Sequence, residues 1–319
     1  MNIAKFILGR RFFSSFVKKH VGIRDSDIPP MLQICRSNSL DSLINDVNPN
    51  ATKIPHTLSN IFPQNEYIAI NNLKHIMGKN IHNTSFIGMG YYNTYTPFPI
   101  KRHVLENPLW YTAYTPYQSE ISQGRLESQY NYQTVIKELT GLPIANSSLL
   151  DEASSSTEVI NICYAYQKRE KKTFLCSKTL HPQTLAVLKT RAKVLNVNLV
   201  IMDLSEDSVL DLDLNDVFGI MFQYPDTYGN INIPLELIHR AKEHNILTSC
   251  ATDLMALTKL KTPGELGIDI AFGNSQRFGI PLWFGGPHPA FLAATDKLIR
   301  LLPGRIIGKS KDLRTLFSY

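Results

Sequence analysis

The chain has 319 residues, of which 43% are apolar and 19% charged, a composition typical of a globular protein with a substantial core. The net charge is +6, but residues 1–20 hold five basic side chains and no acid, so the remainder is nearly neutral. Positive charge is therefore not spread over the rest of the chain, which argues against nucleic acid as a partner.

Residues 1–19 have the composition of a mitochondrial presequence, with lysines and arginines, no acid, and apolar side chains such as Ile7, Leu8 and Phe12 between them. The alternative is a short basic arm that packs on the domain. The apolar run is too short and too interrupted by charge to span a membrane, and no other membrane span is apparent. The sequence therefore predicts import into the mitochondrial matrix.

Residues 20–84 are predicted to form an N-terminal arm with short helices. Apolar side chains recur at helical spacing behind Ser39, a suitable N-cap: Leu40, Leu43, Ile44 and Val47.

Residues 85–118 are unusually rich in tyrosine, and repeated X-Pro pairs exclude a long helix there. Tyrosine offers a flat surface with one polar end, which suits a small polar substrate or a planar cofactor. A coil that packs an interface is an equally good interpretation. The tyrosines are Tyr91, Tyr92, Tyr95, Tyr111, Tyr114 and Tyr117.

Ser119–Thr140 is predicted to be a long helix that ends at a left-handed Gly141. Beyond residue 145, apolar runs of strand length alternate with helical patterns at 184–194 and 235–243. This alternation predicts an α/β fold with a mainly parallel sheet and helices on both faces. The predicted strands are Thr173–Ser177, Asn198–Met202, Phe218–Phe222, Ile246–Ala251 and Ile268–Phe272.

Ligands of such sheets bind beyond the carboxyl ends of the strands, so the loops there are candidate sites. Ser154 and Ser155 open a helix whose N-terminus could hold a phosphate. Ordinary N-capping is the alternative, and the acids Asp151 and Glu152 weigh against an anion.

Two further loops carry groups suited to an aromatic cofactor. His181 could place an imidazole over a ring, or be an ordinary turn residue. Asp253 could pair with a pyridinium nitrogen, or cap the next helix.

The loop after the predicted strand at 268–272 lacks the residue that such a loop often carries. In pyridoxal-phosphate enzymes of the aspartate-aminotransferase fold, a loop of this layout, followed by a Gly-Gly turn and another apolar strand, bears the Schiff-base lysine. Here Asn274, Ser275, Gln276 and Arg277 fill it. The Gln276 amide cannot form an imine, so we expect no catalytic residue in this chain.

The cysteines and histidines give no support for a metal site. The four cysteines lack C-x-x-C spacing, and the nine histidines include no H-x-x-x-H or H-E-x-x-H pair. Reduced, mostly buried thiols are expected.

Several long motifs occur in one order over most of the chain, and with them the chain resembles the N-terminal half of the glycine cleavage system P-protein, glycine dehydrogenase (decarboxylating). The most specific are F-I-G-M-G-Y-Y-N (86–93), Y-T-P-Y-Q-S-E-I-S-Q-G-R-L-E-S (114–128), H-P-Q-T (181–184), F-Q-Y-P-D-T (222–227), A-T-D-L (251–254) and G-N-S-Q-R-F-G-I-P (273–281).

The resemblance implies an aspartate-aminotransferase-like fold, the pyridoxal-phosphate-transferase fold type I, with its large domain at 85–312. It implies glycine decarboxylation on pyridoxal phosphate, with transfer of the aminomethyl group to lipoyl-H-protein. The cofactor would be held covalently by a lysine-bearing partner half. Gln276 would stand at the lysine position, in a degenerate site with Ser154, Ser155, His181 and Asp253. This chain would supply substrate- and cofactor-facing residues to the partner's site: Tyr91, Tyr92, Asn93, Thr115, Tyr117, Ser119 and Gln123.

After Asp312 the sequence no longer follows the family pattern, so 313–319 are interpreted as a divergent tail, and the small C-terminal domain and the lysine-bearing half are not expected here. Three origins fit: a separate short subunit, a degenerate paralogue, or a truncated gene product. A catalytically inactive structural or regulatory subunit that stabilises a partner is the rival function. A stand-alone pyridoxal-phosphate binder without an imine is a third.

Overall fold

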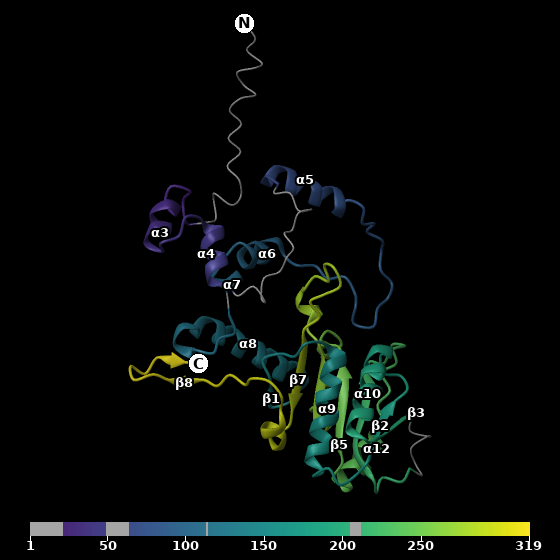
Figure 1. The fold of residues 1–319 in the computed structure, drawn as a ribbon. Helices are drawn as coiled ribbons and strands as arrows, with labels where there is room; N and C mark the ends of the chain where they lie inside the picture. The colour runs from purple at the N-terminus through teal and green to yellow at the C-terminus, as the bar shows by residue number, and fades with distance from the viewer. Residues whose placement is uncertain (1–21, 49–63, 113, 205–211) are drawn as a thin grey trace. The chain divides into compact units, whose positions relative to one another are not determined.

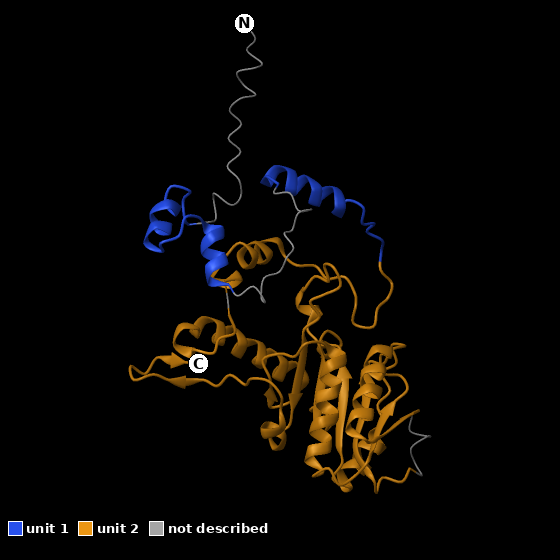
Figure 2. Ribbon diagram, in the orientation of Figure 1, with its two compact units in different colours: residues 1–84 blue, residues 85–319 orange. Residues whose placement is uncertain are grey.

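The computed structural model describes residues 22–48, 64–112, 114–204 and 212–319. The predicted presequence, residues 1–19, lies outside the described residues. The chain divides into two compact units, Met1–Thr84 and Ser85–Tyr319 (Figure 2).

The described part of the first unit consists of helices whose residues are all at least partly exposed: α3 (Ile28–Ile34), α4 (Leu40–Val47) and α5 (Glu66–Met77). The predicted helix behind Ser39 is confirmed, because the Ser39 hydroxyl accepts a hydrogen bond from the Ser42 backbone N–H at 3.0 Å. These helices therefore have no buried core of their own within the described residues.

The second unit is built on a seven-stranded sheet, with the strand order β1-β7-β6-β5-β4-β2-β3 (Figure 1). Strands β3, β2, β4, β5 and β6 run parallel to one another, while β7 is antiparallel to both β6 and β1. The predicted, mainly parallel sheet is confirmed. Its strands are β1 (Ile144–Ala145), β2 (Thr173–Ser177), β3 (Asn198–Met202), β4 (Val217–Tyr224), β5 (Leu247–Thr252), β6 (Ile270–Asn274) and β7 (Ala290–Ala294).

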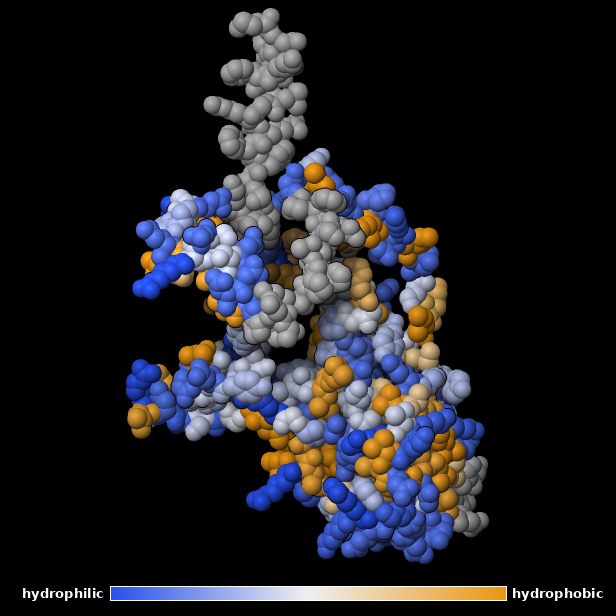
Figure 3. Space-filling model, in the orientation of Figure 1, coloured by the Kyte–Doolittle hydropathy of each residue, from blue (hydrophilic) through white to orange (hydrophobic). Residues whose placement is uncertain are grey.

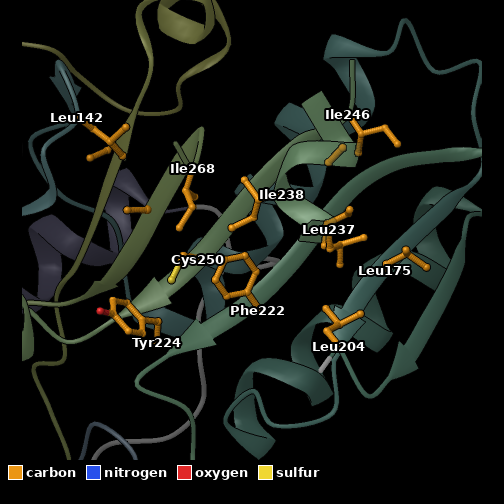
Figure 4. Packing of buried hydrophobic residues seen from close by; sticks show 14 of the residues in the cluster. Leu142, Leu175, Leu204, Phe222, Tyr224, Leu237, Ile238, Ile246, Cys250 and Ile268 are labelled. Carbon is orange, nitrogen blue, oxygen red and sulfur yellow. The ribbon is translucent and has the colours of Figure 1, made fainter. Parts of the chain in front are cut away.

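Helices cover both faces of this sheet, as the sequence predicts. One core includes side chains from α8 and α12, and the other includes side chains from α9 and α10. Figure 4 shows the first core, where Leu237 and Ile238 of α12 lie beside Phe222 of β4. The helices of this unit are α6 (Phe98–Leu105), α7 (Pro108–Tyr111), α8 (Gln123–Thr140), α9 (Glu152–Tyr166), α10 (Pro182–Leu195) and α12 (Leu235–Glu243).

The long helix starts later than predicted. Ser119–Ile121 form a short 3-10 turn, and α8 begins only at Gln123, because Ser122 has a φ of −125° and leaves the helical conformation. The predicted end is confirmed: Gly141 adopts a left-handed φ of +67°. Other 3-10 turns are η3 (Ala256–Thr258), η4 (Gln276–Phe278) and η5 (Asp296–Leu301).

The last residues form a two-stranded hairpin of β8 (Ser310–Lys311) and β9 (Phe317–Ser318). Tyr319 beyond it contacts α8, where its ring lies 5.6 Å from that of Tyr130. The end of the chain is therefore held on α8 through Tyr319, whereas residues 313–317 are exposed.

Many tyrosines of the 85–118 segment remain on the surface of the second unit, where apolar and polar residues are interspersed (Figure 3). The exposed fractions of Tyr114 and Tyr117 are 87% and 83%. In the part of the chain that the structure describes, no helix is both long and apolar enough to cross a membrane.

Candidate functional site

A cavity of about 270 Å3 opens beyond the carboxyl ends of β4, β5 and β6, where the parallel topology predicts a ligand site. Its floor is supplied by the strand ends and its side by the turn at 88–92. The side chains that matter for its chemistry are Tyr92, Glu152, His181, Asp253, Asn274 and Arg277.

Glu152 is a buried carboxyl group at the start of α9. It accepts a hydrogen bond at Oε2 from the Asn274 side-chain amide at 2.7 Å. Burial raises the pKa of Glu152 to about 7, an effect that the Asn274 hydrogen bond partly offsets. The neighbouring Gly90 has a φ of +86°, and a Cβ there would lie 2.9 Å from Asn274 Nδ2, so this turn needs glycine.

His181 is held as a neutral imidazole in this cavity. Burial lowers the pKa of His181 to about 4, and the Gln223 amide lies 2.9 Å from its Nε2. Its Nδ1 lies 2.9 Å from the Thr227 hydroxyl. The Gln223 amide nitrogen also lies 3.1 Å from Nδ1, so it lies against the ring and not on the lone pair of a single nitrogen.

Asp253, at the end of β5, is fully engaged by neighbouring groups. The Arg277 guanidinium donates to it through Nε at 3.0 Å to Oδ1 and through Nη2 at 2.7 Å to Oδ2. The Met255 backbone N–H also donates to Oδ1 at 3.0 Å. The Arg277 guanidinium also lies over the Tyr92 ring, with its central carbon 3.6 Å from the ring centroid.

Gln276 is fully buried and is not among the residues that line this cavity. Its amide Nε2 donates to the Ile280 carbonyl at 3.0 Å, and its backbone N–H donates to Asn274 Oδ1 at 3.1 Å. The residue therefore fixes the conformation of the loop after β6.

The α9 N-terminus is capped from within the chain. Asp151 Oδ1 accepts from the Ser154 backbone N–H at 2.6 Å, and the Ser155 hydroxyl donates to the Asp151 carbonyl at 3.0 Å. A carboxylate thus stands where a bound phosphate would need the same N–H group.

Taken together, these contacts do not fit pyridoxal phosphate bound to this chain. The Asp253 carboxylate is paired with Arg277, the Ser154 N–H is capped by Asp151, and Gln276 supplies no amine. A cofactor that used the Asp253 carboxylate or the Ser154 N–H would displace a contact that the chain already makes with itself.

The predicted site residues fall into two groups. Tyr92, His181 and Asp253 line the cavity together, whereas Gln276, Ser154 and Ser155 lie outside its lining. Tyr91 lies beside the cavity, where it stacks on His288 with centroids 4.3 Å apart and donates to Gln183 Oε1 at 2.5 Å.

The remaining predicted residues lie away from the cavity. Asn93, Thr115 and Tyr117 are exposed and Ser119 is half-buried. Gln123 is engaged by the end of the chain: it donates to the Tyr319 carbonyl and accepts from the Tyr319 N–H, both at 2.9 Å.

Sequence reasoning missed the convergence of Glu152, Asn274 and Arg277 on the cavity. The signal for Arg277 was present, since it directly follows Gln276 in the loop that faces the end of β5. No spacing in the sequence indicates that Arg277 pairs with Asp253. The two residues are 24 positions apart, and they meet because β5 and β6 are neighbours in the sheet.

Comparisons with known proteins agree with one another. A family model described as "Glycine cleavage system P-protein" matches residues 18–319, including the segment 313–319 that was predicted to be a divergent tail. Glycine dehydrogenase (decarboxylating) of Psychromonas ingrahamii is 47% identical over 297 residues, covering 93% of this chain and 30% of that protein. The mitochondrial glycine dehydrogenase (decarboxylating) of Mus musculus is 46% identical, covering 93% of this chain and 28% of that protein.

A solved structure extends the likeness to the fold. The crystal structure of glycine decarboxylase (P-protein) of the glycine cleavage system, in inhibitor-bound form, matches with a TM-score of 0.80 at 29% identity, covering 94% of this chain and 68% of that one. The α/β fold and the family resemblance are thereby confirmed. The chain spans about 30% of the length of the curated relatives it matches.

Proposed function

Because the chain belongs to the glycine cleavage system P-protein family, we propose that it is a component of glycine dehydrogenase (decarboxylating) that works with a lysine-bearing partner half. The substrate is glycine, and the aminomethyl group passes to lipoyl-H-protein. The reactive pyridoxal phosphate belongs to the partner half.

The observation that carries this division of labour is the Asp253–Arg277 pair. The carboxylate that could serve a pyridinium ring is already matched by a guanidinium, and the neighbouring loop offers Gln276 in place of a lysine. A P-protein-family chain with that arrangement needs a lysine from outside these 319 residues for the covalent chemistry.

In the assembled enzyme, pyridoxal phosphate supplies the electron sink for decarboxylation. This chain contributes residues of its exposed segments that bind and orient the substrate. Asn93, Thr115 and Tyr117 present an amide and two hydroxyl groups that the chain's own cavity does not use. Such groups can fix a small polar substrate and help to exclude water at an interface.

Reconstitution tests this proposal. The purified chain, the lysine-bearing half of a P-protein, lipoyl-H-protein and pyridoxal phosphate are combined, and exchange of labelled bicarbonate into the glycine carboxyl group is measured. We expect no exchange from either half alone and exchange from the mixture. Equal exchange with and without this chain would contradict the proposal.

Tyr117→Phe tests whether the Tyr117 side chain serves the partner's active site or only packs at an interface. The change removes one exposed hydroxyl and almost no volume, so the melting temperature of the chain should not change. We expect the exchange rate of the reconstituted complex to fall about tenfold, as for a lost hydrogen bond to a polar reacting group. Tyr95→Phe, at a similarly exposed tyrosine outside the proposed set, is the matched control. Unchanged exchange in Tyr117→Phe would favour packing.

The same pair of halves tests a rival function, a catalytically inactive subunit that stabilises its partner. One observation favours this rival: the Asp253 carboxylate and the Ser154 N–H are already occupied by Arg277 and Asp151 of the same chain. It predicts that the chain raises the partner's melting temperature by mass action but adds nothing to the exchange rate per folded partner.

We also propose that the chain is imported into the mitochondrial matrix, on the basis of the basic, acid-free residues 1–19. Fused to a fluorescent reporter, these residues should direct it to mitochondria. A variant with Arg10, Arg11, Lys18 and Lys19 changed to glutamine should remain in the cytosol. Cytosolic fluorescence from the unchanged fusion would refute this placement.

A further inference from the structure

The Arg277 side chain is held in a specific geometry, between a carboxylate and an aromatic ring. Two of its nitrogens donate to the two oxygens of Asp253, and its flat face lies on Tyr92. Both partners of the ion pair are about 30% exposed, so the pair is shielded from much of the solvent.

A guanidinium shares the recognition features of a protonated aromatic ring. Both are planar cations with delocalised charge, both present N–H donors in the plane, and both stack on aromatic faces. At Asp253 such a ring would need an in-plane donor to the carboxylate and a face against a neighbouring flat side chain. Arg277 supplies both from inside the chain.

The same stack connects the turn at 88–93 to the sheet. Tyr92 receives the guanidinium on its face, and its hydroxyl donates to Asn274 Oδ1 at 3.3 Å. Next to it, the Gly90 carbonyl lies 3.1 Å from His288 Nε2. The exposed Asn93 follows Tyr92 directly in the chain.

We propose that Arg277 takes, from within the chain, the place that a protonated aromatic ring would occupy at Asp253, and that the Asp253–Arg277–Tyr92 stack holds the turn at 88–93 in position. Arg277 is thus a positioning residue. The inference deepens the proposed function and rests on it for one point, that pyridoxal phosphate belongs to the partner half.

Chemical rescue tests this role in the full chain. Arg277→Ala should lower the melting temperature by about 4 °C, as expected for loss of a partly buried ion pair. Millimolar guanidinium chloride should restore most of that loss, because the free cation can enter the vacated place, and sodium chloride should not. Amide hydrogen exchange of a peptide covering 88–96 should speed up in Arg277→Ala and slow again with guanidinium.

Arg191→Ala is the matched control, because Arg191 also donates through Nε and Nη2, but to the neutral Asn161 amide oxygen. It should show no guanidinium-specific recovery. In Asp253→Asn/Arg277→Ala the recovery should also disappear. Recovery absent from Arg277→Ala, or equal in the Arg191 control, would overturn the proposal.

Arg277→Lys keeps a charge but loses the planar fork, which covers the case in which the alanine variant does not fold. It should fold and still exchange faster at 88–96 than the unchanged chain. Unchanged exchange would overturn the positioning role. These readouts need neither partner nor activity, so a negative result here leaves the bicarbonate-exchange test standing, and failure of that test leaves the stack intact.

Discussion

Replacing Gly273 with alanine is expected to destabilise the second unit by about 3 kcal/mol or more, which corresponds to a fall in melting temperature of about 10 °C. Gly273 lies in β6, between β5 and β7. A Cβ there would lie 2.2 Å from the Thr252 carbonyl oxygen and 2.8 Å from the Phe291 ring. Backbone on one side and a fully buried ring on the other leave no soft neighbour to move.

The matched control for this prediction is Gly124→Ala in α8, where nothing lies within 4 Å of the added Cβ. That change should leave stability unchanged or raise it by about 0.5 kcal/mol, since alanine favours the helix. Urea unfolding followed by far-UV circular dichroism measures both. Equal midpoints for the two variants would contradict the close packing of β5, β6 and β7 behind the cavity.

Glu152→Gln is expected to stabilise the chain at pH 8 by up to about 3 kcal/mol, and by less than about 1 kcal/mol at pH 5. The pKa of Glu152 is raised by burial from 4.5 to about 7 in the folded chain. Between these two values the folded state binds more protons than the unfolded state. The Glu152 contribution to stability is therefore present below pH 4.5 and is lost as pH rises through 7. The neutral glutamine amide has no proton to lose.

The comparison must be made as a difference between the two proteins, because His181 acts in the opposite direction. The pKa of His181 is lowered by burial from 6.5 to about 4, so its neutral form is favoured and its contribution is lost as pH falls below 6.5. Subtracting the unfolding curves of the unchanged chain from those of Glu152→Gln removes this common part. A difference that stays constant from pH 5 to pH 8 would contradict the buried, proton-binding state of Glu152.

Much of the sheet was predictable because its strands are short apolar runs bounded by polar turns. Thr173–Ser177 and Asn198–Met202 were predicted with the bounds that the structure gives them. The start of α8 was predicted wrongly, since Ser119–Ile121 has a sequence compatible with either helix type. Local propensity does not distinguish a 3-10 turn from an α-helical turn, because the contacts around the segment determine which one forms.

The candidate site was only partly predictable. The sequence identified His181 and Asp253, because each lies in the segment after a strand, and the carboxyl ends of these parallel strands meet at one edge. It also identified the loop that contains Gln276 and Arg277. It did not reveal that Arg277 reaches across to Asp253, or that Asn274 and Glu152 meet over 122 residues of chain. Such pairings depend on the order of strands in the sheet, which one sequence does not specify.

We propose that these 319 residues serve a glycine-decarboxylating site whose pyridoxal phosphate is bound by the lysine-bearing half. The most direct measurement is borohydride reduction of the reconstituted complex of this chain and a lysine-bearing half, followed by peptide mapping of the phosphopyridoxyl group. Reduction converts an imine into a stable secondary amine at the lysine that formed it. We expect the label on a lysine of the partner half and none on this chain. A label on a lysine of this chain, together with bicarbonate exchange by this chain alone, would contradict it.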